Sequence, residues 1–562
     1  MKGFQNIIQL IIIITIIIVV NIIANFYYST IDLTEEKRHT LSSSTKSVID
    51  QVDDVMYIKV LLAGDFPSGF KRLQNATKDL LEEFSDMNPN IEYIFDDPLE
   101  GDQEDVIKRR DQLSKDGIIP IALKFFDGKE YIQKAMYPYA LISYHNRNTK
   151  ISLVKEQTIG EDEEVTLNKS IERLEYKFTN LFQKLNLERK QNIAFSIGNG
   201  EVPYERTIRL ETELKNHYNT GRLNLDSLIV IDQALDLLII AGPTKAISDK
   251  SKFKIDQYIM NGGKVMWFIE KLDANLDSIS QQKFYIPHDI VTGVDDLLFK
   301  YGVRIQPNLV LDLEASSIPQ VVGQQNGKPQ TMQYKWFYHP LALPNQNHPI
   351  GKNIDRVNLF FPSSIETIKT KTNVTKTPIL TSSPYSRHQL NPVRLNFEIL
   401  KYPPKEKQFN KGKQTLGMLL EGEFESAYKN RVNKEFKEGL DQVNIDYKEK
   451  SISTKQILFT DVDFIKNFVN HRTKSAEPIG YNKWEQKVYE GNRDFILNAV
   501  EYMLDDNNVL DSRSKQVKLR LLDAVKTKNE KSKWQFFNLG LPLIFLAFFG
   551  LLFNLFRRRR YR

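Results

Sequence analysis

The segment Gly198-Asn199-Gly200-Glu201-Val202-Pro203 comes nearest to a ligand-binding motif in this sequence. It follows a strand-like run and precedes a helix-like one, which is where a dinucleotide-binding fingerprint lies. Pro203 replaces the third glycine of that fingerprint, and Glu201 puts an acid where a pyrophosphate would bind. The segment therefore reads first as a tight strand-to-helix turn, and its functional alternatives are phosphate binding and a carbohydrate or peptide contact. The candidate ligand-binding residues are Gly198, Asn199, Gly200 and Glu201.

A second glycine-containing segment, GQQNGKP at residues 323–329, resembles a phosphate-binding P-loop. It has three residues between its glycines where the P-loop has four, and Pro329 replaces the Ser or Thr that would hold Mg²⁺. The segment is therefore predicted to be a surface loop, and the chain is expected to have no ATPase activity of its own.

Other chemistry-bearing patterns are weak. The chain has no cysteine, which excludes disulfides, thiol nucleophiles and cysteine metal sites. Its eight histidines form no pair at i, i+3 or i+4, and no G-x-S-x-G segment occurs. The carboxylate pairs Asp96-Asp97 and Asp461-x-Asp463 follow strand-like runs, where they could act in acid–base chemistry or bind Ca²⁺. Solvated loop acids are the commoner explanation, so we expect no catalytic residue, no metal site and no cofactor.

The residues around the first turn alternate between strand-like and helix-like runs. Residues 192–201 read as a strand and a turn, 205–217 as a helix, and 235–270 as strand, loop, helix and strand. This alternation predicts a doubly wound α/β domain over residues 189–300. The second helix is predicted to turn apolar residues inward and charged residues outward. The inward set is Phe253, Ile255, Tyr258 and Ile259, and the outward set is Lys250, Lys252, Lys254 and Asp256.

The flanking regions have their own patterns. Residues 56–95 read as strand, helix and strand, which predicts a βαβ unit with a parallel pair in an α/β module over 29–188. Within it, runs at 119–126 and 139–144 flank Asp127-Gly128, a hairpin signal, and 163–186 read as one closing helix. Residues 301–490 are richer in strand-like runs and predict a β-rich module, while 491–534 predict a helical stalk.

Two uncharged apolar runs, residues 7–24 and 536–556, are long enough to cross about 30 Å of hydrocarbon. Aromatic residues rather than a small-x-small cleavage site follow the first, so 1–28 are expected to be a retained transmembrane anchor. Residues 535–562 are expected to be a C-terminal transmembrane helix with a basic cytoplasmic tail. Five arginines in that tail predict that both termini are cytoplasmic and that residues 26–534 lie outside.

The net charge of +6 arises at the ends of the chain. Lys2 and the five tail arginines account for it, and residues 26–534 carry no net charge. Nucleic-acid binding therefore lacks its usual electrostatic basis, and no nucleic-acid partner is expected.

Several stretches along the chain carry a family resemblance. In chain order they are DLTEEKRHTLSSSTK, IEYIFDDPLE, GNGE, LLIIAGPTKAISDKSKFKIDQYIMNGGKVMWF, LLEGEFESAYKNR and LRLLDAVKTKNEKSKWQFFNLGLPL with the final RRRRYR. Together they resemble the gliding-motility-associated ABC-transporter auxiliary proteins of Bacteroidota. The core of residues 189–300 is similar to the wider ABC-transporter auxiliary domain, itself like a class I glutamine amidotransferase fold without the nucleophile. The resemblance implies an ABC permease subunit and a separate cytoplasmic ATPase subunit as partners and a role in gliding, and it supplies no catalytic residue.

The expected fold is α/β: a membrane-anchored ectodomain with a βαβ module, a doubly wound amidotransferase-like domain and a β-rich module, flanked by two transmembrane helices. The expected function is that of a non-catalytic periplasmic, substrate-binding-like auxiliary subunit of an ABC transporter in the bacterial inner membrane, involved in gliding motility. One alternative is an envelope scaffold that docks motility or secretion proteins without a transported ligand. Another is an envelope hydrolase that uses loop carboxylates.

Overall fold

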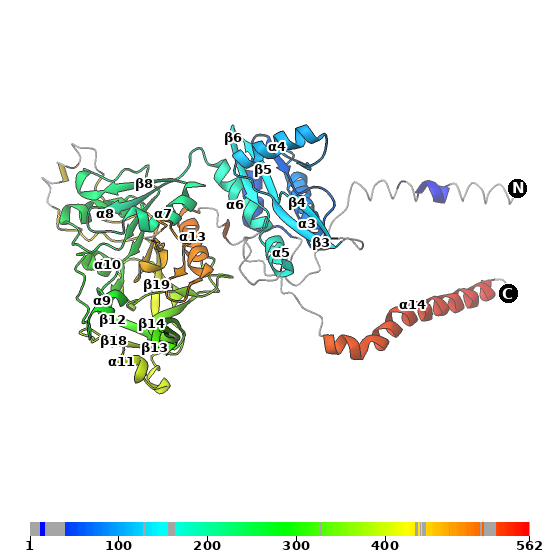
Figure 1. Ribbon diagram of the computed structural model, residues 1–562. Helices are drawn as coiled ribbons and strands as arrows, with labels where there is room; N and C mark the ends of the chain where they lie inside the picture. Colours follow the sequence, from blue (N-terminus) through cyan, green and yellow to red (C-terminus); the bar gives the residue numbers. More distant parts are fainter. Residues whose placement is uncertain are drawn as a thin grey trace. The chain divides into compact units, whose positions relative to one another are not determined.

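The computed structural model describes residues 12–16, 19, 40–126, 131–154, 163–325, 327–432, 437–438, 440, 446–470, 473–505, 509–510 and 524–560 (Figure 1). Contacts divide the chain into two units. The larger is Thr40–Ser514, and the smaller joins Met1–His39 with Lys515–Arg562.

The N-terminal part of the larger unit, blue and cyan in Figure 1, is an α/β module around a four-stranded sheet in the order β2-β1-β5-β6. Strands β1 (Met56–Val60) and β2 (Ile91–Phe95) are parallel and are connected through α3 (Ser68–Met87), which is the predicted βαβ unit. Helix α3 buries residues three and four apart, so one stripe packs on the sheet. The remaining elements are α2 (Ser43–Asp50), α4 (Gln103–Lys115), β5 (Tyr139–Tyr144), β6 (Arg147–Ser152), α5 (Glu163–Glu172) and α6 (Leu174–Asn186).

This module differs from the sequence reading at two places. Strand β3 (Ile121–Phe126) pairs with β4 (Tyr131–Met136), a strand that the sequence reading missed, while β5 pairs with β1 and β6. The predicted hairpin residues Asp127 and Gly128 lie outside the described residues. The predicted single helix over 163–186 is two helices, because the chain turns at Arg173 between α5 and α6.

A mixed sheet organises the rest of the larger unit. Its order is β13-β14-β17-β19-β20-β10-β9-β7-β8, and β15 also pairs with β14. The five strands from β20 to β8 are parallel and, numbered along the chain, stand in the order 5-4-3-1-2. That is the strand order of flavodoxin-like doubly wound folds. The strands are β7 (Asn192–Ile197), β8 (Asn219–Asn224), β9 (Leu237–Ala241), β10 (Lys264–Phe268), β13 (Ala315–Gln325), β14 (Lys328–Pro344), β15 (Val357–Asn358), β17 (Val374–Thr381), β19 (Thr415–Gly422) and β20 (Thr454–Phe459).

Helices cover both faces of the parallel strands, which confirms the predicted α/β class (Figure 1). Because successive strand residues face opposite sides, Leu237 and Ile239 of β9 pack with α7 (Tyr204–Lys215) and α13 (Glu490–Leu504). The alternate residues of β9 pack with α8 (Asp249–Met260) and α10 (Asp295–Tyr301). Helix α13 was expected to be part of a stalk, yet its apolar side chains lie in the core of the sheet domain.

The sheet continues across residue 300, since β10 and β20 are neighbours. Its strands therefore come from both the expected doubly wound domain and the expected β-rich module. Smaller pairs and short helices surround it. They are β11 (Val303–Ile305) with β16 (Ile365–Thr367), β12 (Asn308–Asp312) with β18 (Ser386–Leu390), β21 (Tyr481–Asn482) with β22 (Lys487–Val488), and the helices η1 (Leu225–Ser227), α9 (Leu276–Gln281), α11 (Glu398–Lys401), η2 (Glu406–Gln408) and η3 (Asp463–Ile465).

The predicted outward face of α8 is wrong at two positions. Lys252 and Asp256 were expected to face solvent, and both are buried. Asp256 is buried because segments outside α8 cover it. It accepts hydrogen bonds from the Tyr301 hydroxyl, the Ser426 hydroxyl and the backbone N–H of Ala427.

In the smaller unit, helix α14 (Ala524–Arg560) contains a stretch, Lys533–Arg559, that is long and apolar enough to cross a membrane. Pro542 lies within it without ending it. Of the N-terminal apolar run only residues 12–16 and 19 are described, all helical, so most of the predicted first anchor lies outside the described residues. Of the predicted helical stalk over 491–534, residues 506–508 and 511–523 lie outside them as well.

Candidate functional site

The carboxyl edge of the parallel strands carries the predicted site residues. In doubly wound sheets ligands bind at this edge, where the strand order reverses. Here the reversal lies between β7 and β9. The turn at residues 198–203 follows β7, and the loop at 242–247 follows β9. The four candidate residues therefore stand at the topological switch point of the sheet.

Within the turn, Gly198 and Gly200 have φ angles of 114° and 76°, in the region that favours glycine. The backbone N–H of Asn199 donates to Glu201 Oε2 at 2.6 Å. The Asn199 carbonyl accepts from the N–H groups of Thr244 and Lys245 at 3.0 and 2.9 Å. The turn is thus folded around its own acid and fastened to the loop after β9.

The polar atoms of the turn differ in which ligand chemistry they favour. Phosphate sites at such turns use free backbone N–H donors, but Glu201 already occupies the N–H of Asn199. Two buried acceptor oxygens, Asn199 Oδ1 and Glu201 Oε1, have no hydrogen-bond partner among the described residues. The turn therefore offers acceptors, which suit a ligand that donates hydrogen bonds rather than an anion.

A second group of polar residues lies along the same edge, beyond β10 and β20. Glu270, Asp461 and Asp463 each place a carboxylate oxygen so that the three atoms lie within 4.8 Å of one another. Asp461 is buried, and its oxygens accept from the backbone N–H groups of Phe360 and Asp463, both at 2.7 Å. Asp463 Oδ1 accepts from Lys466 Nζ at 2.5 Å.

The surroundings shift the pKa values of these three acids in different directions. Burial raises the pKa of Glu270 to about 7. It also raises the pKa of Asp461 well above its ordinary value, and the neighbouring carboxylates add to the effect. Burial acts in the same direction on Asp463, but the positive charges of Lys466 and Arg206 hold its pKa below the ordinary value. Asp463 is therefore the acid of the group that stays ionised most readily.

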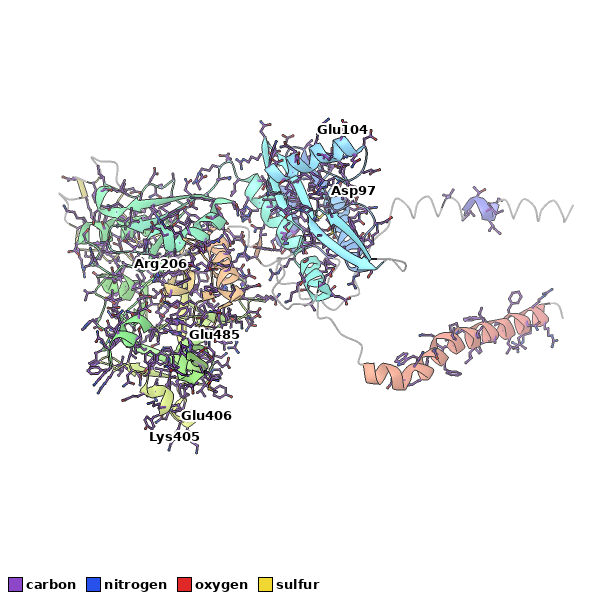
Figure 2. All side chains as sticks on the ribbon, in the orientation of Figure 1. Asp97, Glu104, Arg206, Lys405, Glu406 and Glu485 are labelled. Atoms are coloured by element: carbon purple, nitrogen blue, oxygen red, sulfur yellow. The ribbon has the colours of Figure 1, made fainter. Side chains whose placement is uncertain are left out.

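Glu270 and Asp463 line a cleft of about 380 Å³, within the size range of small-ligand sites. The cleft is lined by both charged and aromatic side chains. Arg206, labelled in Figure 2, is one of the cations. The lining also includes Glu270, His339, Phe360, Phe361, Asp463, Lys466, Phe468, Tyr481 and Trp484. Such a cleft could bind a small polar ligand against its aromatic rings.

The two carboxylate pairs noted in the sequence lie in different parts of the fold. Asp96 forms an ion pair with Lys59 at 2.6 Å, and Asp97 accepts from the N–H of Leu99 at 2.9 Å. Figure 2 labels Asp97 on the four-stranded module, whereas Asp461 follows β20 of the mixed sheet. The commoner explanation, solvated loop acids, does not hold for Asp461, which is 1% exposed.

Sequence reasoning missed Glu270 as a partner of Asp461. Both residues stand two positions after the end of their strand, and Phe268 of β10 pairs with Phe459 of β20. Equal offsets on neighbouring parallel strands bring the two acids together. The acid after each strand was visible in the sequence, but the adjacency of β10 and β20, which lie far apart along the chain, was not.

The P-loop-like segment is the turn of a hairpin. Strands β13 and β14 pair through Gln324 with Pro329 and Gln325 with Lys328, and Asn326 lies outside the described residues. A P-loop leads from a strand into a helix. This segment leads into a strand, in agreement with the surface-loop reading.

Comparisons with known proteins give the following matches. A family model described as an ABC-type uncharacterized transport system matches residues 190–499, and a Domain of unknown function (DUF7088) matches residues 35–143. A Borreliella burgdorferi protein named only as uncharacterized is 26% identical over 414 residues, which are 72% of this chain and 75% of the relative. The solved structure titled mmIFT52 N-terminal domain aligns with a TM-score of 0.30 at 12% identity, over 56% of this chain and 97% of that one. A TM-score this low decides nothing about the fold.

Proposed function

Since the chain belongs to the family described as an ABC-type uncharacterized transport system, we propose that it is a non-catalytic auxiliary subunit of an ABC transporter complex in a bacterial inner membrane. The observation that carries the proposal is the family match over residues 190–499. That range begins just before β7 and ends within α13, so it contains the parallel strands and the cleft at their carboxyl edge.

The partners follow from what the chain itself offers. An ABC transporter needs a permease and an ATPase, and the P-loop-like segment of this chain is a hairpin turn. We therefore propose a separate permease subunit and a separate cytoplasmic ATPase subunit as partners. Helix α14, with a stretch that could cross a membrane, supports an attachment beside such a permease.

The finer assignments rest on the sequence. We propose that the larger unit lies in the periplasm, that both termini are cytoplasmic, and that the complex serves gliding motility. The arginines at the end of α14 and the apolar N-terminal run support the topology. The resemblance to gliding-motility proteins supports the process. The cleft is the proposed place for a substrate or an envelope partner.

Purification from native membranes tests the proposal. The affinity-tagged full chain, solubilised in mild detergent, should retain an ABC permease and a nucleotide-binding ATPase, identified by mass spectrometry. In a matched control chain, a leucine-rich span replaces residues 536–556. This chain should still enter the membrane but should retain less permease, because the side chains of α14 that would pack on the permease are lost. Recovery of motility or secretion proteins without either transporter subunit would favour the scaffold instead.

The isolated chain should neither bind nor hydrolyse ATP, and turnover free of contaminating ATPase would refute this. For the topology, a reporter that is active only in the periplasm should be silent when fused after Arg562. The same reporter fused after Asp523, ahead of α14, is the matched control and should be active. Activity at Arg562 contradicts the proposed orientation.

A further inference from the structure

We propose that Glu270, Asp461 and Asp463 bind one divalent metal ion of the Mn²⁺ type at the inner end of the cleft, and that His339 contacts a water bound to that ion. The proposal concerns the site itself and does not depend on a role in transport.

The first support is geometric. One oxygen from each acid lies within 4.8 Å of the others. Oxygens around a small octahedral cation stand roughly 3 to 4 Å apart, so small side-chain rotations bring these three into one coordination shell. Carboxylate oxygens are also the donors that Mn²⁺, Mg²⁺ and Ca²⁺ prefer.

The second support is the way Asp461 is held. Each of its oxygens accepts one backbone N–H, from Phe360 and from Asp463, both at 2.7 Å. An ionised carboxylate has about four lone pairs, so each oxygen keeps one for a cation. Hydrogen bonds to the outer side of a ligand are the usual way in which proteins fix it toward a metal.

The third support is charge. Three acids meet Lys466, which is bonded to Asp463, and Arg206, which lines the same cleft. With all three acids ionised, these five side chains carry one net negative charge around the buried Asp461. Either a cation or a shared proton must supply the balance.

The fourth support is independent of the acids. His339 of β14 is 1% exposed, and neither of its ring nitrogens has a hydrogen-bond partner among the described residues. It lines the same cleft as Glu270 and Asp463, and its ring packs edge-on against Phe360 and Phe361 at centroid distances of 4.6 and 5.1 Å. Buried polar groups nearly always have a partner, and a bound ion, or a water on that ion, would provide one here.

Titration with MnCl₂ tests the site. The full chain in detergent is treated with EDTA, dialysed and titrated while the paramagnetic resonance signal of free aqueous Mn²⁺ is recorded. We expect one Mn²⁺ per chain. Glu270→Gln and Asp463→Asn should each weaken binding roughly tenfold or more, and His339→Phe should weaken it as well. If Glu270→Gln does not fold, Asp463→Asn decides.

Asp277→Asn is the matched control, because this acid lines the same cleft but is 70% exposed and lies outside the group. Its affinity for Mn²⁺ should equal that of the unaltered chain. As a second readout, Mn²⁺ should raise the unfolding temperature of the unaltered and control chains but not of Glu270→Gln.

Three results would overturn the proposal. Absence of saturable binding up to about 1 mM, the weak end of natural Ca²⁺ sites, would show a proton-sharing acid cluster instead. Binding that survives both Glu270→Gln and Asp463→Asn would place the ion elsewhere. Unchanged affinity in His339→Phe would remove the imidazole from the site. A chain that co-purifies with a permease yet binds no Mn²⁺ refutes this site alone.

Discussion

The Tyr301 hydroxyl donates a hydrogen bond of 2.9 Å to the Asp256 carboxylate, and both side chains are fully buried. Asp256 also accepts from Ser426 Oγ at 2.7 Å and from the N–H of Ala427 at 2.9 Å. One acid of α8 therefore joins α10 and the segment after β19. These contacts hold together elements on one face of the parallel sheet.

Asp256→Ala should destabilise the larger unit by roughly 3 to 5 kcal/mol, because it leaves several buried donors without an acceptor. Asp249→Ala is the matched control on the same helix. That acid is 92% exposed and pairs with Lys252 at 3.0 Å, so its loss should change stability by less than about 1 kcal/mol. Denaturant unfolding followed by tryptophan fluorescence measures both, and equal effects would contradict the assigned role of Asp256.

Gly200→Ala should destabilise the protein by roughly 2 to 4 kcal/mol, through the positive φ of 76° and a collision of the new Cβ with Thr244 Oγ1. Adding Thr244→Ala removes the collision but not the backbone strain, so the double variant should recover part of the loss. Gly412→Ala isolates the strain, because Gly412 has a φ of 70° and open space around it. Thermal unfolding compares the three, and no recovery in the double variant would mean that the collision is absent.

The buried His339 should make the protein less stable in acid. Burial lowers its pKa to about 3 in the folded protein, whereas the unfolded chain takes up a proton near pH 6.5. The stabilisation is complete above pH 6.5 and is lost as the pH falls from there toward 3. This histidine alone should lower the unfolding free energy by about 2 kcal/mol between pH 7 and pH 5.

His339→Phe should remove that part of the pH dependence, since phenylalanine does not titrate. Unfolding curves at pH 7 and pH 5, recorded in EDTA, measure the difference between the two chains. An identical acid dependence in both would show that His339 titrates normally.

Helix α14 offers a test of mechanical coupling that rests on the proposed function. Its backbone is helical from Ala524 to Arg560, so it could carry motion of a permease outward as a rigid element. Two glycines inserted after Lys528 should weaken the helix by about 1 kcal/mol each and uncouple the complex while the chain still assembles. Two alanines inserted at the same point shift the register equally but keep the helix. Equal ATPase coupling and equal gliding in both variants would favour a passive stalk.

The sequence determined the local elements well wherever hydrophobic periodicity dominates. The runs that became β1, β2, β9, β10 and β20 were legible, as were the alternation that predicts an α/β fold and the C-terminal apolar helix. It also placed Gly198–Glu201 in a strand-to-helix turn, because glycine at positive φ followed by proline marks such turns chemically.

Only the tertiary structure decided which strands lie side by side and which charged residues become buried. Strands β10 and β20 are separated by nearly two hundred residues, and their pairing brings Glu270 to Asp461. Asp256 and Lys252 look like solvent-facing positions from helical periodicity, but elements distant in sequence cover that flank of α8. The spacing of apolar residues along a helix predicts the face that packs on the sheet. It does not predict that other segments will cover a second face, because those contacts are made by residues outside the helix.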